Sequence, residues 1–164
     1  MLVSHDGVRW LTECLAALTG QTRAPQQVVA VDTGSTDGSP TMLATALGER
    51  GVVKLPRQTS FADAVQAGID AADGESPSDR ADQSLTRWVW ILHDDCAPEP
   101  DALRQLLAAA AQSPSLAAIA PKALSWDRRG LREVGLTVDS SGRTHTGLET
   151  REVDQGGEAC LRPL

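Results

Sequence analysis

Two adjacent carboxylates follow an apolar run near the middle of the chain. The run Trp88–Leu92 ends abruptly in His93, Asp94 and Asp95. Neighbouring carboxylates in a loop can bind Mg²⁺ or Mn²⁺, because these ions prefer hard oxygen ligands and share their coordination shell with substrate phosphates. A solvated acidic turn after a strand is the alternative, and the residues alone do not decide between the two.

A second polar stretch, at 32–39, reads DTGSTDGS and follows the apolar residues 28–31. A carboxylate such as Asp32 at the end of a strand can accept hydrogen bonds from ribose hydroxyls or from the N–H of a base. Glycines such as Gly34 let the backbone approach a ligand closely. A tight connection into a capped helix would use the same Ser and Asp residues. The stretch contains neither the GK[ST] of a P-loop nor the GxGxxG of a dinucleotide site.

A third polar stretch, Ser4-His5-Asp6-Gly7, follows a short apolar segment at the start of the chain. A single loop histidine is more often structural or solvated than catalytic. In an open α/β sheet, however, ligands bind at the carboxyl ends of the strands. His5, Asp32 and the acidic pair together therefore predict a nucleotide and metal site at one sheet edge.

The three cysteines, Cys14, Cys96 and Cys160, are sparse and show no CxxC spacing. This pattern indicates a reducing compartment without a disulfide framework. We expect Cys14 to lie in the core. A zinc site from His93, Asp95 and Cys96 would have suitable ligand types, but these residues are too close in sequence to surround one ion easily.

The spacing of apolar residues predicts the helices and strands that position these residues. Asp6 is expected to cap the first helix and Ser39 the second. The order of strands and helices predicts a three-layer α/β/α fold with a mainly parallel sheet. The expected strands are 2–3, 28–31, 51–55, 87–92 and 116–120, and the expected helices are 8–19, 40–47, 61–72 and 101–112.

The pattern changes after Pro121. Segments 131–138 and 143–148, joined by the turn sequence DSSG, predict a C-terminal β-hairpin. Residues 73–85 are polar and are expected to form a surface loop. No element is predicted in 149–164. We therefore expect one domain over 1–148 and an irregular tail over 149–164.

Composition limits the classes of function. A chain of 164 residues with 41% hydrophobic residues fits one soluble domain. The net charge of −7 argues against a nucleic-acid-binding surface. Without an apolar run of about 18 residues, this chain is not expected to cross a membrane, so any membrane association would come through other segments. No signal peptide is visible, and a cytoplasmic location is expected.

Together the motifs resemble the family 2 glycosyltransferases of the GT-A fold, and they are most similar to the large actinobacterial members. The VDxGSTDGS element combined with an acidic motif at this distance is the specific part. The resemblance covers about residues 1–148, and this chain looks like the N-terminal, donor-binding portion. It rests on VSHDG at 3–7, WL at 10–11, CL at 14–15, QT at 21–22 with Pro25, VDTGSTDGS at 31–39, LHDD at 92–95 and PEPDAL at 98–103.

The resemblance implies an inverting transfer of a sugar from a nucleotide-diphosphate donor to a hydroxyl of a glycan or lipid-linked acceptor. Asp32 would contact the base or ribose of the donor. Asp94 and Asp95 would match the DxD-type metal motif, with Asp95 the direct ligand of Mg²⁺ or Mn²⁺. Ser4 and His5 would border the nucleotide, Gly34 would belong to its loop, and Asp63 would lie near the same pocket.

Two departures from the family pattern matter. His93 stands where many members have a third acidic residue. The general base of the family follows the hairpin region, and none of Glu149, Glu152 and Asp154 is identified as that base.

A fragment that binds nucleotide sugar without turnover, or an interaction module, is therefore the alternative function. A nucleotidyltransferase and a Rossmann oxidoreductase rank lower. Loss of an acceptor half would also expose apolar surface and favour self-association.

Overall fold

The computed structural model describes residues 1–75, 87–113, 115–135, 137–138, 140–141 and 143–145. The chain divides into two compact units, 1–104 and 105–164, and each is described by itself.

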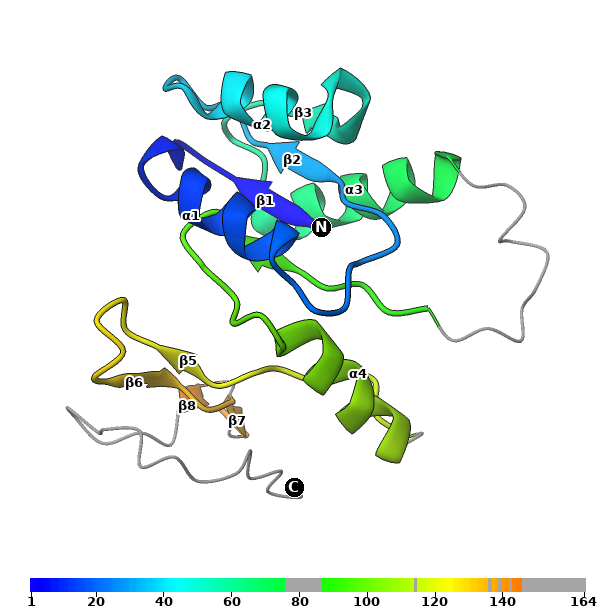
Figure 1. Cartoon of the computed structure of the whole chain (residues 1–164), viewed down its shortest axis with the longest axis vertical. Helices are drawn as coiled ribbons and strands as arrows, with labels where there is room; N and C mark the ends of the chain where they lie inside the picture. The colour runs from blue at the N-terminus through cyan, green and yellow to red at the C-terminus, as the bar shows by residue number, and fades with distance from the viewer. Residues whose placement is uncertain (76–86, 114, 136, 139, 142, 146–164) are drawn as a thin grey trace. The chain divides into compact units, whose positions relative to one another are not determined.

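The first unit is built on a parallel sheet of four short strands, in the order β3-β2-β1-β4 (Figure 1). Ser4 is the register partner of Asp32, and Val3 that of His93. The carboxyl ends of neighbouring strands therefore meet at one edge of the sheet, as the polar stretches predicted. The strands are β1 (Leu2–Ser4), β2 (Ala30–Asp32), β3 (Val52–Lys54) and β4 (Leu92–His93).

Helices cover both faces of this sheet. Alternate strand residues point to opposite faces, so Leu2 and Ala30 pack in one cluster while Val3 and Val31 pack in another. The first cluster includes residues of α1 (Val8–Thr19) and α2 (Ser39–Leu47), and the second includes Ala64 of α3 (Phe61–Glu75). A 3₁₀ turn, η1 (Glu49–Gly51), leads into β3. This arrangement confirms the predicted three-layer α/β/α fold.

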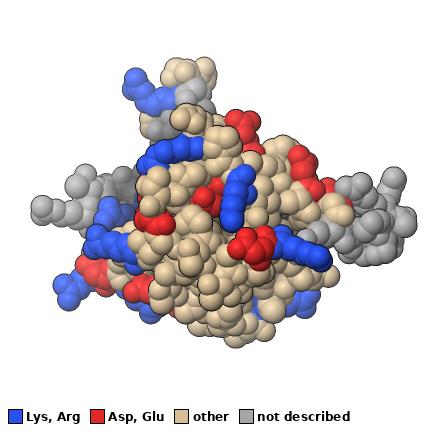
Figure 2. Space-filling model, turned by 90° about the horizontal axis from the view of Figure 1, so that it is seen from above, with Lys and Arg blue, Asp and Glu red and all other residues tan. Residues whose placement is uncertain are grey.

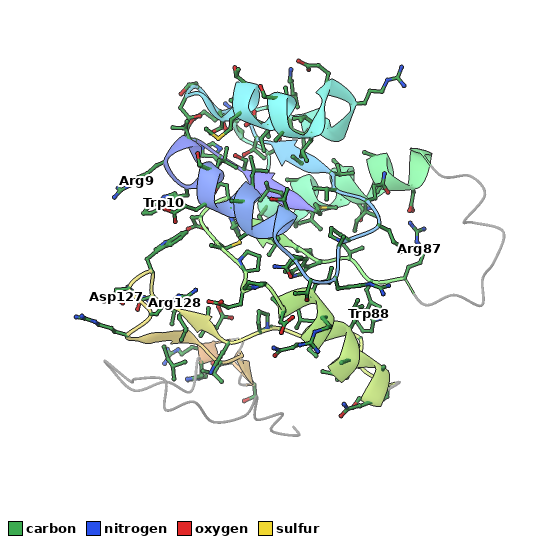
Figure 3. The ribbon with its side chains drawn as sticks, in the orientation of Figure 1. Arg9, Trp10, Arg87, Trp88, Asp127 and Arg128 are labelled. Atoms are coloured by element: carbon green, nitrogen blue, oxygen red, sulfur yellow. The ribbon has the colours of Figure 1, made fainter. Side chains whose placement is uncertain are left out.

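Two predicted strands are wrong in extent or in existence. Segment 87–92 pairs with β1 only at its end, where Leu92 and His93 are the register partners of Leu2 and Val3. Before it, Arg87 forms an ion pair with Asp73 of α3 (Nη2–Oδ1, 2.7 Å); Arg87 is labelled in Figure 3. Segment 116–120 forms no strand. Three of its five residues are alanines, which have low strand propensity.

The predicted helix caps are also wrong in their residues. Gly7, not Asp6, occupies the cap position of α1, and the Val8 amide donates to Asp37 Oδ2 at 3.0 Å. Ser39 is the first residue of α2, and its amide donates to Asp37 Oδ1 at 2.8 Å. Asp37 thus accepts the first backbone amide of both helices. The apolar periodicity of a helix does not indicate which residue caps it, so this arrangement could not be predicted.

The first unit also includes the start of α4 (Ala102–Gln112), where buried Gln21 joins three chain segments. Its Nε2 donates to the Glu99 carbonyl at 2.8 Å, and its Oε1 accepts the Leu103 amide at 3.1 Å. The segment between β4 and α4 is thereby attached to the end of α1. Within the described ranges, no helix has the length and apolar character needed to cross a bilayer.

The second unit contains two antiparallel strand pairs. β5 (Ala123–Leu124) pairs with β6 (Leu131–Glu133), and β7 (Thr137–Val138) pairs with β8 (Thr144–His145). The predicted C-terminal hairpin is confirmed at β7 and β8. Its first strand, expected over 131–138, is instead divided at Gly135, whose φ of +91° interrupts extended backbone. The predicted tail at 149–164 lies outside the described residues.

Candidate functional site

The ends of β1 and β2 hold two buried polar side chains side by side. Ser4 is 0% exposed and Asp32 is 3% exposed. Asp32 Oδ2 accepts the Ser35 amide at 3.1 Å. Among the described residues, neither Asp32 Oδ1 nor Ser4 Oγ has a hydrogen-bond partner. Asp32 Oδ1 can accept a hydrogen bond, and Ser4 Oγ can both donate and accept one.

His5 is fixed against the loop that follows β2. Its Nδ1 lies 3.0 Å from the carbonyl oxygen of Thr33 and 2.9 Å from Thr33 Oγ1, and Thr33 Oγ1 lies 3.1 Å from the Ser4 carbonyl. A carbonyl can only accept, so we assign the proton to Nδ1. On the other edge of the ring, Nε2 lies 3.9 Å from Asp6 Oδ2.

Asp94 is held in a confined position. The side chain is 7% exposed, and its Oδ2 accepts the His5 amide at 2.8 Å. A Cβ atom at Gly7 would lie only 2.0 Å from the same oxygen. In the loop after β1, the His5 amide therefore binds this carboxylate, and the missing side chain of Gly7 leaves space for it. Asp94 thus lies beside the end of β1.

His93, Asp94 and Asp95 can each direct a ligand atom to one place. One such atom from each residue lies within 4.8 Å of the other two. His93 and Asp95 are exposed, and the His93 ring stacks on Phe61 of α3, with centroids 4.5 Å apart and planes at 7°. The sequence analysis considered His93 only for a disfavoured zinc site and as a departure from the acidic motif, and it did not consider Phe61 for the site. Their positions at the end of β4 and at the start of α3 could be anticipated from the sequence, but their stacking could not.

An exposed ion pair between Asp6 and Arg57 joins the loop after β1 to the loop after β3. Asp6, at φ +51°, accepts the Thr36 amide at 2.7 Å, and its Oδ2 lies 2.6 Å from Arg57 Nη2. The hydrogen bond from Arg57, then the Thr36 amide, hold the pKa of the Asp6 carboxyl well below its ordinary value. Arg57 also donates to the Gly34 carbonyl at 3.2 Å. Sequence reasoning missed this link, because no local motif connects residues 6 and 57.

Gly34 and Asp63, two of the predicted site residues, have clear structural surroundings. Gly34 has a φ of +69°, and a Cβ there would lie 2.7 Å from the Arg57 amide nitrogen. Asp63 lies in the first turn of α3, where its Oδ2 accepts from Ser60 Oγ at 2.6 Å and its amide donates back at 3.1 Å. This reciprocal pair is a helix-capping arrangement. A role for Asp63 at the ligand stays a prediction.

An apolar groove of about 690 Å³ lies between α1 and α2. Its lining includes Val8, Leu15 and Met42 and contains no charged side chain. The groove therefore lacks the groups that a metal or a diphosphate needs.

Figure 2 shows acidic and basic side chains interspersed on the face that it draws.

Comparisons with known proteins bear on the family to which this chain belongs. The comparison with curated proteins gave no match. Among solved structures, the chain is similar to S. aureus TarS 1–349, solved in complex with UDP, at a TM-score of 0.49 and 14% identity. That match covers 76% of this chain and 38% of the TarS chain, so this chain spans well under half of its length. The expected likeness to actinobacterial members stays a prediction. The family model for glycosyl transferase family 2 matches residues 2–150, and the chain therefore belongs to that family.

Proposed function

We propose that this chain binds the nucleotide-diphosphate-sugar donor of a metal-dependent, inverting glycosyltransferase. The acceptor would be a hydroxyl of a glycan or of a lipid-linked molecule. Bond formation at the sugar carbon would release the nucleotide diphosphate. The sparse cysteines support a cytoplasmic site for this reaction.

The buried oxygens of Asp32 and Ser4 carry this proposal. A buried polar group without a partner costs about 1–3 kcal/mol, and such groups are rare in native proteins. A ribose hydroxyl or a base N–H would donate to Asp32 Oδ1, which lacks a partner among the described residues. The arrangement therefore fits the nucleoside end of the donor, with Ser4, His5 and Gly34 lining that end.

The acidic pair fits the diphosphate end. Two carboxylates and an imidazole converge within 4.8 Å, and oxygen ligands suit Mg²⁺ or Mn²⁺. We assign Asp95 as the direct ligand because it is exposed, whereas Asp94 is largely buried and bonded to His5. A metal bound there would act as a Lewis acid on the phosphates of the departing nucleotide. Stacking on Phe61 would hold His93 beside them.

Transfer also requires a group that accepts the proton of the attacking hydroxyl. The acids that follow the hairpin, Glu149, Glu152 and Asp154, lie outside the described residues, and none is assigned as the base. Donor binding and turnover are therefore separate properties of this chain. The alternative, binding without turnover, is an outcome of the test below.

The test measures the melting temperature with UDP, GDP or dTDP, each with and without Mn²⁺. We expect one nucleotide with Mn²⁺ to raise it, because ligands that bind only the folded state stabilise that state. Asp95→Ala should remove the metal-dependent part of the shift. Asp70→Ala, at an exposed position on α3, is the matched control and should keep it.

Absence of a metal-dependent shift with every nucleotide would contradict the proposal. If the shift appears, incubation with the corresponding nucleotide sugars and a hydroxyl acceptor then separates the alternatives. Release of nucleotide diphosphate with formation of a glycoside supports a complete enzyme. Binding without release at long times identifies a donor-binding fragment.

A further inference from the structure

Two thiols meet at one backbone carbonyl in the first unit. Cys14 lies in the middle of α1 and is fully buried, whereas Cys96 lies in the loop after β4 and is partly exposed. The carbonyl oxygen of His93 is 3.7 Å from Cys14 Sγ and 2.9 Å from Cys96 Sγ. Cys96 also packs against the buried cluster that contains Cys14. Residues 82 positions apart thus bring their sulfur atoms into reach.

The two cysteines differ in their access to solvent. A two-step oxidation needs one accessible thiol that reacts first and a second thiol that is held beside it. Cys96 is reachable from solvent, while Cys14 is fixed by the helix and by its packing in the core. A sulfenic acid formed on an accessible cysteine condenses with a neighbouring thiol to a disulfide. In a reducing compartment such a disulfide is transient rather than structural.

Metal binding is a weaker use for these sulfur atoms. The metal-capable cluster found among the described residues consists of His93, Asp94 and Asp95, and it includes neither thiol. The thiols approach the backbone carbonyl of His93 rather than its ring. Their placement favours reaction with each other.

We propose that Cys14 and Cys96 are a reversible oxidation site that closes to a disulfide under peroxide. The Cys96 thiol takes one oxygen from hydrogen peroxide, giving a sulfenic acid and one water. The Cys14 sulfur then attacks the sulfenic sulfur, the S–S bond forms, the S–O bond breaks, and a second water leaves with the Cys14 proton. The two thiols lose two electrons, and the peroxide is reduced to two waters.

Closure would move the loop that holds the acidic pair. A disulfide requires sulfur atoms about 2 Å apart, which is closer than the sulfur atoms of two free thiols can lie. Cys14 is anchored in the core, so the loop carries the movement. Asp94 has little room, since even a methyl group at Gly7 would clash with it. Oxidation should therefore weaken metal and nucleotide binding, a consequence that rests on the proposed function.

The experiment uses the full chain with Cys160→Ser, so that only Cys14 and Cys96 can react. The protein is treated with hydrogen peroxide, quenched and digested with trypsin under non-reducing conditions. We expect the peptides that carry Cys14 and Cys96 to be joined, with a loss of two hydrogens from the intact mass, reversed by dithiothreitol. Cys96→Ser should abolish the linkage.

Oxidation of Cys96 to sulfinic or sulfonic acid without linkage would overturn the proposal, as would a disulfide only between separate molecules. A second arm measures binding of nucleotide diphosphate with Mn²⁺ to the oxidised and the reduced protein. We expect at least tenfold weaker binding after oxidation, restored by dithiothreitol. Unchanged binding in a cross-linked protein would overturn the loop movement alone. If the reduced protein binds no nucleotide, the proposed function fails, while the linkage is still measured.

Discussion

Asp32 has one carboxylate oxygen bonded to the Ser35 amide and another without a donor among the described residues. Asp32→Asn keeps the shape but loses the negative charge. Hydrogen bonds to charged groups contribute about 1.5–3 kcal/mol. We therefore expect nucleotide diphosphate to bind about tenfold or more weakly, both with and without Mn²⁺, by isothermal titration calorimetry. Equal affinity in the variant would show that Asp32 does not contact the nucleotide, and Asp70→Asn is the control.

Gly7 is needed for space rather than for backbone freedom. Its φ of −93° suits any residue, but a Cβ would lie 2.0 Å from Asp94 Oδ2. Gly7→Ala should therefore displace Asp94, lower the free energy of unfolding by about 1–3 kcal/mol and reduce the Mn²⁺-dependent melting shift. Urea denaturation and the nucleotide assay measure these two effects.

Gly74→Ala is the matched control for that substitution. Apart from its chain neighbours and the backbone of its own helix, no atom of the described residues lies within 4 Å of a Cβ built at Gly74, which belongs to α3. Alanine in a helix is favoured over glycine by about 0.5–1 kcal/mol, so this variant should be neutral or slightly stabilised. A stability loss as large as that of Gly7→Ala would contradict the steric explanation.

At the scale of the elements, the Asp6–Arg57 pair joins the loop after β1 to the loop after β3. The pKa of Asp6 is held below its ordinary value of 3.8. The stabilisation is therefore fully present above that value and is lost as the pH falls below it, because the unfolded chain takes up the proton first. We expect the urea midpoint of the wild type to exceed that of Asp6→Asn at pH 7, with the difference shrinking below about pH 4.

Asparagine is the suitable replacement because it tolerates the positive φ of residue 6. Arg57→Gln should lower the midpoint in the same direction. High salt should reduce both differences, since the pair is exposed. A difference that stays constant from pH 7 to pH 3 would show that the ion pair does not support the loops.

The helices and the edge of the sheet could be predicted from periodicity. The range of α1 agrees with its apolar spacing, and Asp32 and Asp94 lie at the expected strand ends. Strand lengths could not be predicted, because a strand extends only as far as its partner does. Segment 87–91 has strong strand propensity, yet the register pairs with β1 begin only at Leu92, and the Trp90 carbonyl accepts the amino group of Met1 at 2.8 Å.

Contacts between residues far apart in the sequence could not be predicted for the site either. Gly7 looks like a loop glycine in the sequence, and its role depends on Asp94, 87 positions away. The contacts of Asp6 with Arg57, of Phe61 with His93 and of Cys14 with Cys96 are of the same kind. Each joins segments whose approach is set by the fold rather than by local spacing.

At the scale of the whole molecule, the segment before β4 exposes apolar side chains. Val89 and Ile91 are 48% and 43% exposed, and β4 is at the edge of the described sheet. An edge with apolar residues invites pairing with another chain. We expect concentration-dependent dimerisation by light scattering, reduced by Ile91→Lys. Val8→Lys, a similar change at an exposed apolar residue on α1, should leave it unchanged. A monomer at all concentrations would contradict this prediction.

The double use of Asp37 has a consequence for exchanging parts between relatives. This residue lies in the loop after β2, yet it accepts the first amide of α1 as well as that of α2. A chimera that takes residues 33–38 from a homologue without an acid at this position would leave both helix starts without their acceptor. The loops after β1 and β2 would therefore have to be exchanged together for both helix starts to keep an acceptor.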